Sequence, residues 1–557
     1  MDQQHPIYDL SSRIVDDLAE LQPVSATYLG IAGHDHRWDD ASPAGLERVA
    51  DYARGALYEI EALPPARDKW ESLAIEVAKT MLTTEIAYFD SGDHLLEFDS
   101  LASRAQDYRQ IFDHMGKDTT QHWHNIAARL EGIDGAFMRY RLLLDEGRAR
   151  GHVVAARQIH AVVEQCRTTA GEESYFSTLR QEFIDSGIND SPLEERIAAG
   201  VAHAKATFGS FGDYLETTYL PDAVQDDAAG RERYLRAAYR FLGTDIDPEA
   251  TYAWGWTEVE RLRTAMAEVA VEIQPGATVA QVIELLNHDP ERAAADRAEF
   301  VSFIEARLET ALTELAGTHF DVPEEIRAVT VQLAPPGGPL GAYYVGPSED
   351  WTRPGSVWWS LKGDGPFSLF DEVSTAYHEG FPGHHLQVGI QMSMSEHLTR
   401  LHRMMVWYPG LGEGWALYSE KLMHELGYFE KPDYVFGWLA SQMLRACRVV
   451  IDLGSHLGFD IPNDQPFHPG EGWSYENGVE MLVNYATLEQ AYAESEMTRY
   501  LGWPAQAISY KVGERVILEL REELMKRPDF DLKKFHADLL EVGPVGLDLL
   551  RSVMLGE

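Results

Sequence analysis

Apolar residues recur at spacings of three and four along the first half of the chain, from about Asp9 to about Ile273. This period places apolar side chains on one face of an α-helix, so we expect a series of amphipathic helices. Turn signals such as Gly33-His34-Asp35 and Leu63-Pro64-Pro65 separate them. The spacing continues after Thr278, which we expect to cap the next helix.

The pattern changes between residues 329 and 362. Runs of β-branched and aromatic residues at 329–333, 342–345 and 356–361 are separated by proline and glycine, which is typical of short strands. Helical spacing returns at Phe370 and continues toward the C-terminus. We therefore predict a mainly α-helical fold with a small β-sheet just before the helix that follows Phe370.

The charge balance limits the partners. The 557 residues include 47 basic and 90 acidic side chains, which gives a formal charge of −43. This charge repels nucleic-acid phosphates and anionic lipids, so neither a nucleic acid nor a membrane is an expected partner.

The first ten residues lack the pattern of a secretory signal, and no apolar run approaches the roughly 20 residues that span a bilayer. We expect a cytoplasmic protein. The two cysteines, Cys166 and Cys447, indicate neither a disulfide framework nor a thiolate metal site.

The strongest candidate for a functional site is the segment His378-Glu379-Gly380-Phe381-Pro382-Gly383-His384-His385. Many zinc hydrolases carry two histidines four residues apart on one helix, with a glutamate beside the first. Here the fourth residue after His378 is Pro382, which cannot bind a metal and which interrupts helical hydrogen bonding. We therefore expect the helix to kink or bulge at Phe381 and Pro382.

Either His384 or His385 could replace the missing ligand. On a straight helix, the residue seven positions after His378 lies about 10.5 Å along the axis. That is too far for two bonds of about 2.0 Å to one zinc ion. A two-residue bulge would instead bring His384 to the usual place of the second histidine. His384 is the preferred second ligand, and His385 is the alternative.

A third ligand is expected from the helix that follows Pro409-Gly410. Glu413 lies in its first turn, and Glu420 lies two turns later on the same face. We predict that Glu413 is the third zinc ligand, and that Glu420 accepts a hydrogen bond from a histidine N–H. Glu379 is predicted to be the general base that takes a proton from zinc-bound water.

Several blocks of the sequence resemble the bacterial family called domain of unknown function 885. They lie at residues 23–30, 378–387, 413–420, 445–456, 506–513 and 535–543. The resemblance covers nearly the whole chain, and the family is grouped by similarity with the gluzincin zinc metallopeptidases. It implies a large helical, zincin-like fold with a small sheet beside the active-site helix and a deep substrate channel. We accordingly expect a helical N-terminal domain at residues 1–275 and a catalytic zincin-like region at 276–557.

Three tyrosines are candidates for supporting roles. Tyr510 is a candidate donor to the oxyanion of a tetrahedral intermediate, since similar enzymes use a tyrosine of a C-terminal helix this way. The alternative is a packed core tyrosine. Tyr343 and Tyr344 lie on an expected edge strand that could align a peptide substrate by main-chain pairing. Alternation along a strand predicts that at most one of them points into the cleft.

Four polar residues, Arg445, Arg448, Asp452 and His456, fall at helical spacing. The simplest interpretation is a buried ion-pair network that braces the site. An arginine that binds a substrate carboxylate is the alternative.

These features predict a zinc-dependent hydrolase, specifically a metallopeptidase that cleaves short peptides, with Zn²⁺ as its cofactor. Two alternatives stay open: a zinc hydrolase of another amide or ester, and a binding protein that has lost catalysis. The presence of Glu379 argues against the second, because a protein that only binds has no use for a base beside its histidine.

Overall fold

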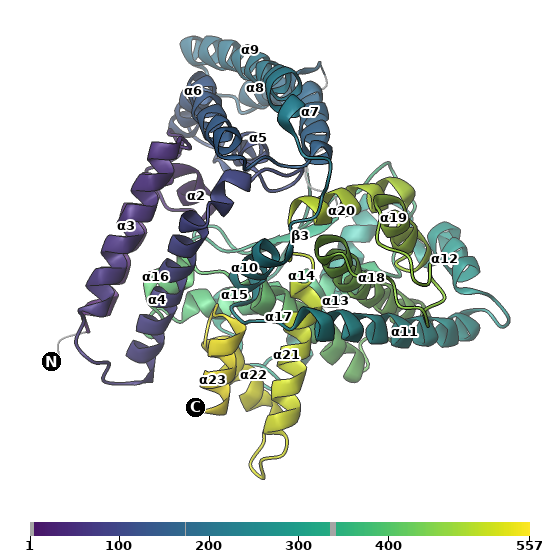
Figure 1. Ribbon diagram of the computed structural model, residues 1–557. Helices are drawn as coiled ribbons and strands as arrows, with labels where there is room; N and C mark the ends of the chain where they lie inside the picture. Colours follow the sequence, from purple (N-terminus) through teal and green to yellow (C-terminus); the bar gives the residue numbers. More distant parts are fainter. Residues whose placement is uncertain (1–4, 173, 335–340, 557) are drawn as a thin grey trace. The chain divides into compact units, whose positions relative to one another are not determined.

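The computed structural model describes residues 5–172, 174–334 and 341–556 (Figure 1). The described chain is mainly α-helical with two small sheets, which confirms the predicted fold class. It forms two compact units. The first extends to Asp227 and includes Thr399–Met405, and the second consists of Ala228–Leu398 and the chain from Val406 onward. None of the described helices combines the length and the apolar character needed to cross a membrane.

The first unit is a helical assembly around an aromatic core. Phe137 packs edge-on against Tyr108 and Phe208, and Trp123 packs in the same way against Phe183. Its helices are α1 (Pro6–Leu21), α2 (Pro23–Tyr28), α3 (Pro43–Glu61), α4 (Lys69–Asp90), α5 (Arg104–His114), α6 (Thr120–Arg150), α7 (Ala156–Ala170), α8 (Tyr175–Asp185), α9 (Ser191–Tyr214) and α16 (Arg400–Met405), with short turns η1 (Asp93–Leu96), η2 (Leu215–Tyr219) and η3 (Leu220–Asp222).

The second unit contains both sheets and the remaining helices. The helices are α10 (Arg231–Leu242), α11 (Pro248–Ile273), α12 (Val279–His288), α13 (Arg297–Leu315), α14 (Glu372–Glu379), α15 (His384–Ser393), α17 (Pro409–Glu425), α18 (Pro432–Leu457), α19 (Tyr475–Asn484), α20 (Gln490–Gly502), α21 (Ser509–Leu524), α22 (Leu532–Glu541) and α23 (Leu547–Leu555), with short turns η4 (Pro290–Arg292) and η5 (Glu324–Ile326). Thr278 caps α12 as predicted, since its hydroxyl accepts a hydrogen bond from the amide of Gln281.

The division of the chain lies after Asp227, whereas the sequence placed it near residue 275. Helix α11, which ends at Ile273, packs along α18 of the second unit (Figure 1). Gly255 permits this approach, because a Cβ atom there would lie 2.8 Å from a methyl group of Val449. Helical periodicity indicates that α11 buries one face, but it does not indicate which element covers that face. The sequence alone therefore could not assign α11 to either unit.

The predicted small sheet is present as β2 (Thr330–Leu333), β3 (Ala342–Val345) and β4 (Ser356–Trp359). Strand β4 lies in the centre, parallel to β2 and antiparallel to β3, so β3 is an edge strand. The proline- and glycine-rich break at 335–340 lies outside the described residues. A second, two-stranded sheet of β1 (Ala293–Ala294) and β5 (Phe367–Ser368) was not predicted, because strands of two residues carry no detectable period.

The three-stranded sheet packs on the helices that precede and follow it. Val331, Val357 and Trp359 of the sheet form one buried cluster with residues of α13 and with Ala376 of α14. This packing holds the sheet beside α14, as the sequence predicted.

Helices α17 and α21 meet through glycines. A Cβ atom on Gly513 would lie 1.8 Å from the carbonyl oxygen of Gly410, and one on Gly414 would lie 2.5 Å from the backbone of Gly513. The two backbones are therefore in direct contact, since no side chain separates them.

Gly513→Val is expected to destabilise the protein by about 3 kcal/mol or more, because the added side chain must push α17 and α21 apart. Thermal and denaturant unfolding would measure the change. Gly55→Ala is the control, since Gly55 lies within α3 and a Cβ atom there would meet no other atom within 4 Å. Equal unfolding midpoints for wild type and Gly513→Val would contradict the close backbone contact.

Candidate metal centre

The helix that begins the candidate site is interrupted at the predicted place. Helix α14 ends at Glu379 and α15 begins at His384, so the chain breaks completely between two helices rather than bulging within one. Pro382 removes a helical N–H. The ψ angle of −126° at Gly380 and Gly383 also leaves the helical region, which accounts for a full break.

The four-residue break, Gly380 to Gly383, is held tightly in place. A Cβ atom on Gly383 would lie 1.9 Å from the carbonyl oxygen of His378, so only glycine fits there. The indole N–H of Trp415, on α17, donates to the carbonyl oxygens of Pro382 at 2.9 Å and Gly383 at 3.3 Å. Helix α17 therefore fixes the loop that leads into His384.

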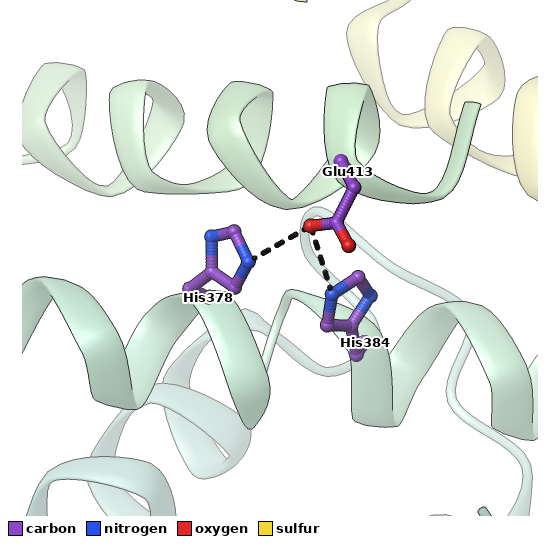
Figure 2. A group of neighbouring side chains, drawn as sticks. All are labelled: His378, His384 and Glu413. Atoms are coloured by element: carbon purple, nitrogen blue, oxygen red, sulfur yellow. Dashed lines mark ion pairs between the residues drawn. The ribbon is translucent and has the colours of Figure 1, made fainter. Parts of the chain in front are cut away.

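The three predicted ligands come together (Figure 2). The Nε2 atom of His378 lies 3.3 Å from Oε2 of Glu413, and the Nε2 atom of His384 lies 3.6 Å from the same oxygen. One ligand atom from each residue lies within 4.8 Å of the others. The two imidazole rings are almost perpendicular, at 89°, so they approach the carboxylate from different directions.

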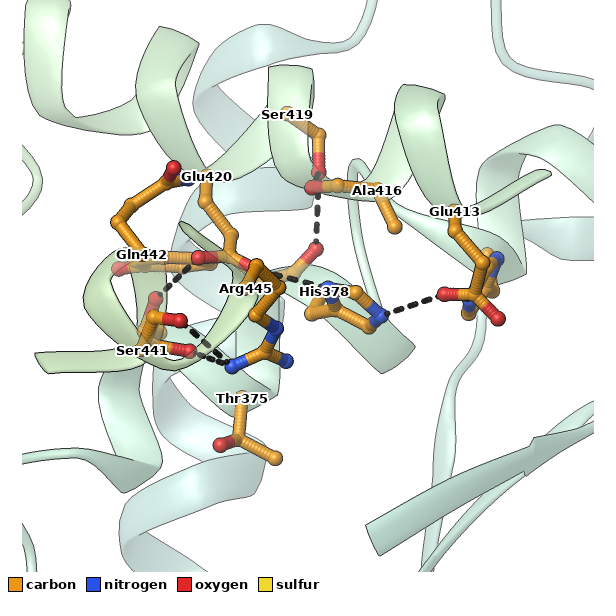
Figure 3. A network of polar contacts seen from close by, with 12 residues as sticks. Thr375, His378, Glu413, Ala416, Ser419, Glu420, Ser441, Gln442 and Arg445 are labelled. Atoms are coloured by element: carbon orange, nitrogen blue, oxygen red, sulfur yellow. Dashed lines mark hydrogen bonds and ion pairs between the residues drawn. The ribbon is translucent and has the colours of Figure 1, made fainter. Parts of the chain in front are cut away.

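The other ring nitrogen of each histidine is held by a polar side chain. Nδ1 of His378 lies 2.7 Å from Oε1 of Glu420 (Figure 3), and Ser374 donates to the second oxygen of that carboxylate at 2.7 Å. The predicted role of Glu420 is thereby confirmed. Nδ1 of His384 lies 3.3 Å from the amide oxygen of Gln387, a partner that the sequence reasoning missed. Its position three residues after His384 on a helix was the available signal.

His385, the alternative ligand, lies outside this group. Its side chain is buried, and its Nε2 lies 2.8 Å from the carbonyl oxygen of Ile326. Its Nδ1 lies 3.2 Å from the hydroxyl of Tyr344. Both nitrogens therefore have partners away from Glu413, and His385 instead connects α15 to strand β3.

The group is electrostatically coupled. Burial alone would lower the pKa of His378, but hydrogen bonds to Glu413 and Glu420 outweigh it and raise the pKa to about 10. Burial alone would raise the pKa of Glu413, but its hydrogen bonds to His378 and His384 hold it well below its usual value. The group thus strongly favours positive charge at the point where the two Nε2 atoms and the carboxylate meet.

A cavity of about 840 Å³ opens over the three residues. Glu379 lies on its wall and is half-buried. Burial removes water from its carboxyl group and so raises the pKa of that group. Within the described part of the chain, the Glu379 side chain forms no hydrogen bond, so its carboxylate is available to a molecule in the cavity.

Tyr343 and Tyr344 both line the cavity, whereas alternation along the strand predicted at most one. The cavity also borders Gly341, Ala342 and Gly346 beside β3 and Trp359 of β4, so it extends along β3 and reaches the neighbouring strand. Tyr343 stacks on Trp358 of the neighbouring strand. Tyr344 reaches His385 with its hydroxyl, which makes it a structural support as well as a wall of the cavity.

Tyr510 lies at the start of α21 and also lines the cavity. Burial and the nearby Glu413 carboxylate raise the pKa of its phenol, so the hydroxyl keeps its proton and can donate it in a hydrogen bond. The side chain is half-buried and lines the cavity, which argues against a fully enclosed core tyrosine, and its role as a donor stays a prediction.

The ion-pair network expected among Arg445, Arg448, Asp452 and His456 is formed only in part: Nε2 of His456 lies 3.8 Å from Oδ1 of Asp452, and both side chains are buried. Arg448 pairs with Glu496 of α20 at 2.7 Å. Asp452 accepts hydrogen bonds from the Tyr234 hydroxyl at 2.6 Å and from a backbone amide. Spacing along α18 showed which residues share a face, but the partners come from other helices that spacing cannot identify.

Trp415→Phe is expected to lower stability by about 1–3 kcal/mol, because it leaves the buried carbonyl oxygen of Pro382 without its donor. The loop would also hold His384 less firmly, so we expect weaker zinc binding. Thermal unfolding and competition with a zinc-binding dye would measure the two effects. The aromatic contact with Phe320 is retained by phenylalanine, so unchanged stability would show that the indole hydrogen bond contributes nothing.

Comparison with known proteins agrees with the resemblance noted in the sequence. The model of the family described as "Bacterial protein of unknown function (DUF885)" matches residues 23–554. The chain belongs to this family. No curated protein matches it.

Two solved structures have the same fold as this DUF885 protein. A "putative lipoprotein" from Colwellia psychrerythraea is 21% identical, with a TM-score of 0.85, and the match covers 99% of this chain and 98% of the other. A "putative lipoprotein of unknown function" from Shewanella oneidensis is 18% identical, with a TM-score of 0.73 and 99% of both chains covered. At these identities the likeness concerns the fold alone.

Proposed function

We propose that this DUF885 protein is a zinc-dependent hydrolase, and specifically a metallopeptidase that cleaves short peptides. The observation that carries the proposal is the convergence of His378, His384 and Glu413 on one point of a large cavity, beside the free carboxylate of Glu379. The resemblance to gluzincin peptidases in the sequence supports the same reading.

The three side chains fit a zinc ion. Atoms bound at about 2.0–2.1 Å to one tetrahedral zinc lie about 3.3 Å apart, and the two Nε2 atoms lie 3.3 and 3.6 Å from the Glu413 oxygen. Two imidazoles and one carboxylate are a donor set that suits zinc and leaves a fourth position open. The Glu420 and Gln387 contacts to the opposite ring nitrogens are the supports that metal-binding histidines commonly have. When bound, zinc would polarise a carbonyl group and make water more acidic.

The remaining residues supply proton transfer and orientation. Glu379 would accept the proton of the attacking water, and its raised pKa brings it closer to neutral pH than an exposed glutamate. Tyr510 would donate a hydrogen bond to the substrate oxygen that becomes negative during attack. Among the described strands β3 pairs only with β4, and its other edge would pair with the main chain of an extended peptide, which favours a peptide over another amide or ester.

The test begins with purified full-length protein and metal analysis. We expect about one equivalent of zinc, and cleavage of members of a mixed dipeptide-to-decapeptide library detected by mass spectrometry. A chelator should stop cleavage and added zinc should restore it. Zinc without peptide cleavage, but with hydrolysis of other amides or esters, would favour the non-peptide alternative. Zinc without any hydrolysis would favour the binding-protein alternative.

We propose the cytoplasm as the location and short peptides as the partners. The two structural relatives are named as lipoproteins, which favours the cell envelope instead. Cell fractionation followed by immunodetection would decide between the cytoplasm and the cell envelope. Recovery of the protein in the envelope fraction would overturn the cytoplasmic proposal.

A further inference from the structure

Two arginines of α18 line the cavity that contains the candidate metal centre. Arg448 is only 6% exposed. Its Nε donates to the Tyr500 hydroxyl at 3.0 Å and its Nη2 to Glu496 at 2.7 Å, but its Nη1 is buried and has no hydrogen-bond partner among the described residues. Two nitrogens of this guanidinium are thus held by hydrogen bonds, and the third has no partner among the described residues.

Arg445 lies one turn earlier on the same helix and is half-buried. Its Nη1 donates to the carbonyl oxygen of Ser441 at 3.1 Å and to the serine hydroxyl (Figure 3). Its Nε is also buried with no partner in the described part of the chain. None of the described carboxylates forms an ion pair with Arg445, although the positive charge of Arg445 acts to lower the pKa of Glu379.

The charges around these arginines do not balance locally. Arg448 and Arg499 both pair with the single carboxylate of Glu496, and Arg445 forms no ion pair with a carboxylate among the described residues. Buried or half-buried charge without a partner is costly, and an anion in the cavity would remove that cost.

The ring of Tyr510 holds both guanidinium groups in position. It lies 4.6 Å from the centre of the Arg448 guanidinium and 5.9 Å from that of Arg445. Cation–π contacts of this kind restrict the orientation of the guanidinium planes. Both guanidinium groups therefore lie beside the same tyrosine that we place next to the reacting bond.

We propose that Arg445 and Arg448 bind the free C-terminal carboxylate of a peptide, so that the enzyme cleaves close to the C-terminus of its substrate. This inference rests on the proposed peptidase function and narrows its substrate class. Both guanidinium groups line the cavity, and two guanidinium groups can donate to the two oxygens of one carboxylate. Glu379 and Glu413 also line the cavity, and negative charge on these carboxylates disfavours a doubly charged phosphate more than a carboxylate.

The test uses zinc-loaded Glu379→Gln protein, which leaves the probes intact. Glycyl-phenylalanine and its C-terminal amide are titrated by calorimetry, with inorganic phosphate as a third probe. We expect the acid to bind at least about 30-fold more tightly than the amide, as charged hydrogen bonds at buried sites commonly give. Adding Arg445→Gln should reduce this preference to less than about 5-fold. Adding Arg515→Gln should not change it, since Arg515 pairs with Glu519 and does not line the cavity.

Arg448→Lys is the second variant, because lysine keeps the charge that pairs with Glu496 while it removes the planar N–H groups. Thermal unfolding and zinc content establish that each variant is intact. Equal affinity for acid and amide, including no binding of either, would overturn the inference. So would a preference that survives Arg445→Gln and Arg448→Lys, or tighter binding of phosphate than of the acid. These binding measurements do not depend on peptide cleavage. Failure of the peptidase proposal is a different result, in which zinc-loaded wild-type protein cleaves no peptide.

Discussion

His384→Gln is expected to reduce bound zinc from about one equivalent to below about 0.1, whereas His385→Gln is expected to keep it. The two histidines are neighbours in the sequence, but only His384 directs a nitrogen at Glu413. His385 directs both of its nitrogens to Ile326 and Tyr344. Loss of one of three protein ligands leaves too few bonds to retain the ion through purification. Inductively coupled plasma mass spectrometry on the purified variants measures the difference.

His385→Gln has its own expected cost. The glutamine cannot reproduce both buried contacts of the imidazole, so we expect a loss of about 1–3 kcal/mol in unfolding free energy while the metal stays bound. His378→Ala and Glu413→Ala should lose zinc as His384→Gln does. If His385→Gln lost the metal and His384→Gln kept it, the assignment of the second ligand would be reversed.

Glu379→Gln is expected to lower the rate of peptide cleavage by about 10³-fold or more while zinc binding stays at one equivalent. Glutamine has nearly the same shape but cannot accept a proton from water, and general-base catalysis commonly contributes 10²–10⁴-fold. Steady-state cleavage of the best library peptide, with metal analysis of the same sample, would measure both quantities.

Glu489→Gln is the matched control for this second prediction. Glu489 also lines the cavity, but it is exposed and lies outside the group of ligands, so its removal should change the rate less than about threefold. A Glu379→Gln enzyme that cleaves at the wild-type rate would show that another group is the base.

Much of the candidate site could be predicted from the sequence because its chemistry is local. Pro382 excludes the usual second ligand by its residue type alone, and geometry then favours His384 over His385. The full break between α14 and α15 was harder to foresee, because it depends on backbone angles at Gly380 and Gly383 that proline does not dictate. The position of Glu413 beside the two histidines could be expected, because it lies near the N-terminus of a helix with a clear start signal; its role as a ligand stays a proposal.

Partners that come from distant parts of the chain could not be predicted in this way. Glu496 lies far from Arg448 in the sequence, and only the packing of α20 against α18 brings them together. The same limit applies to Trp415, whose role depends on where its indole meets the loop at Pro382. Helical spacing identifies the face that a residue occupies, but tertiary packing decides what that face meets.

The backbone contact between α17 and α21 also restricts how this cavity can open. Glu413 directly precedes Gly414, and Tyr510 lies one turn before Gly513, so both side chains are attached to a pair of helices that cannot slide apart without breaking the glycine contact. Entry of a substrate therefore cannot proceed by separating the carboxylate from the phenol. Any widening has to come from other elements that line the cavity, among them strand β3, which is paired with β4 and held to α15 by the contact between Tyr344 and His385.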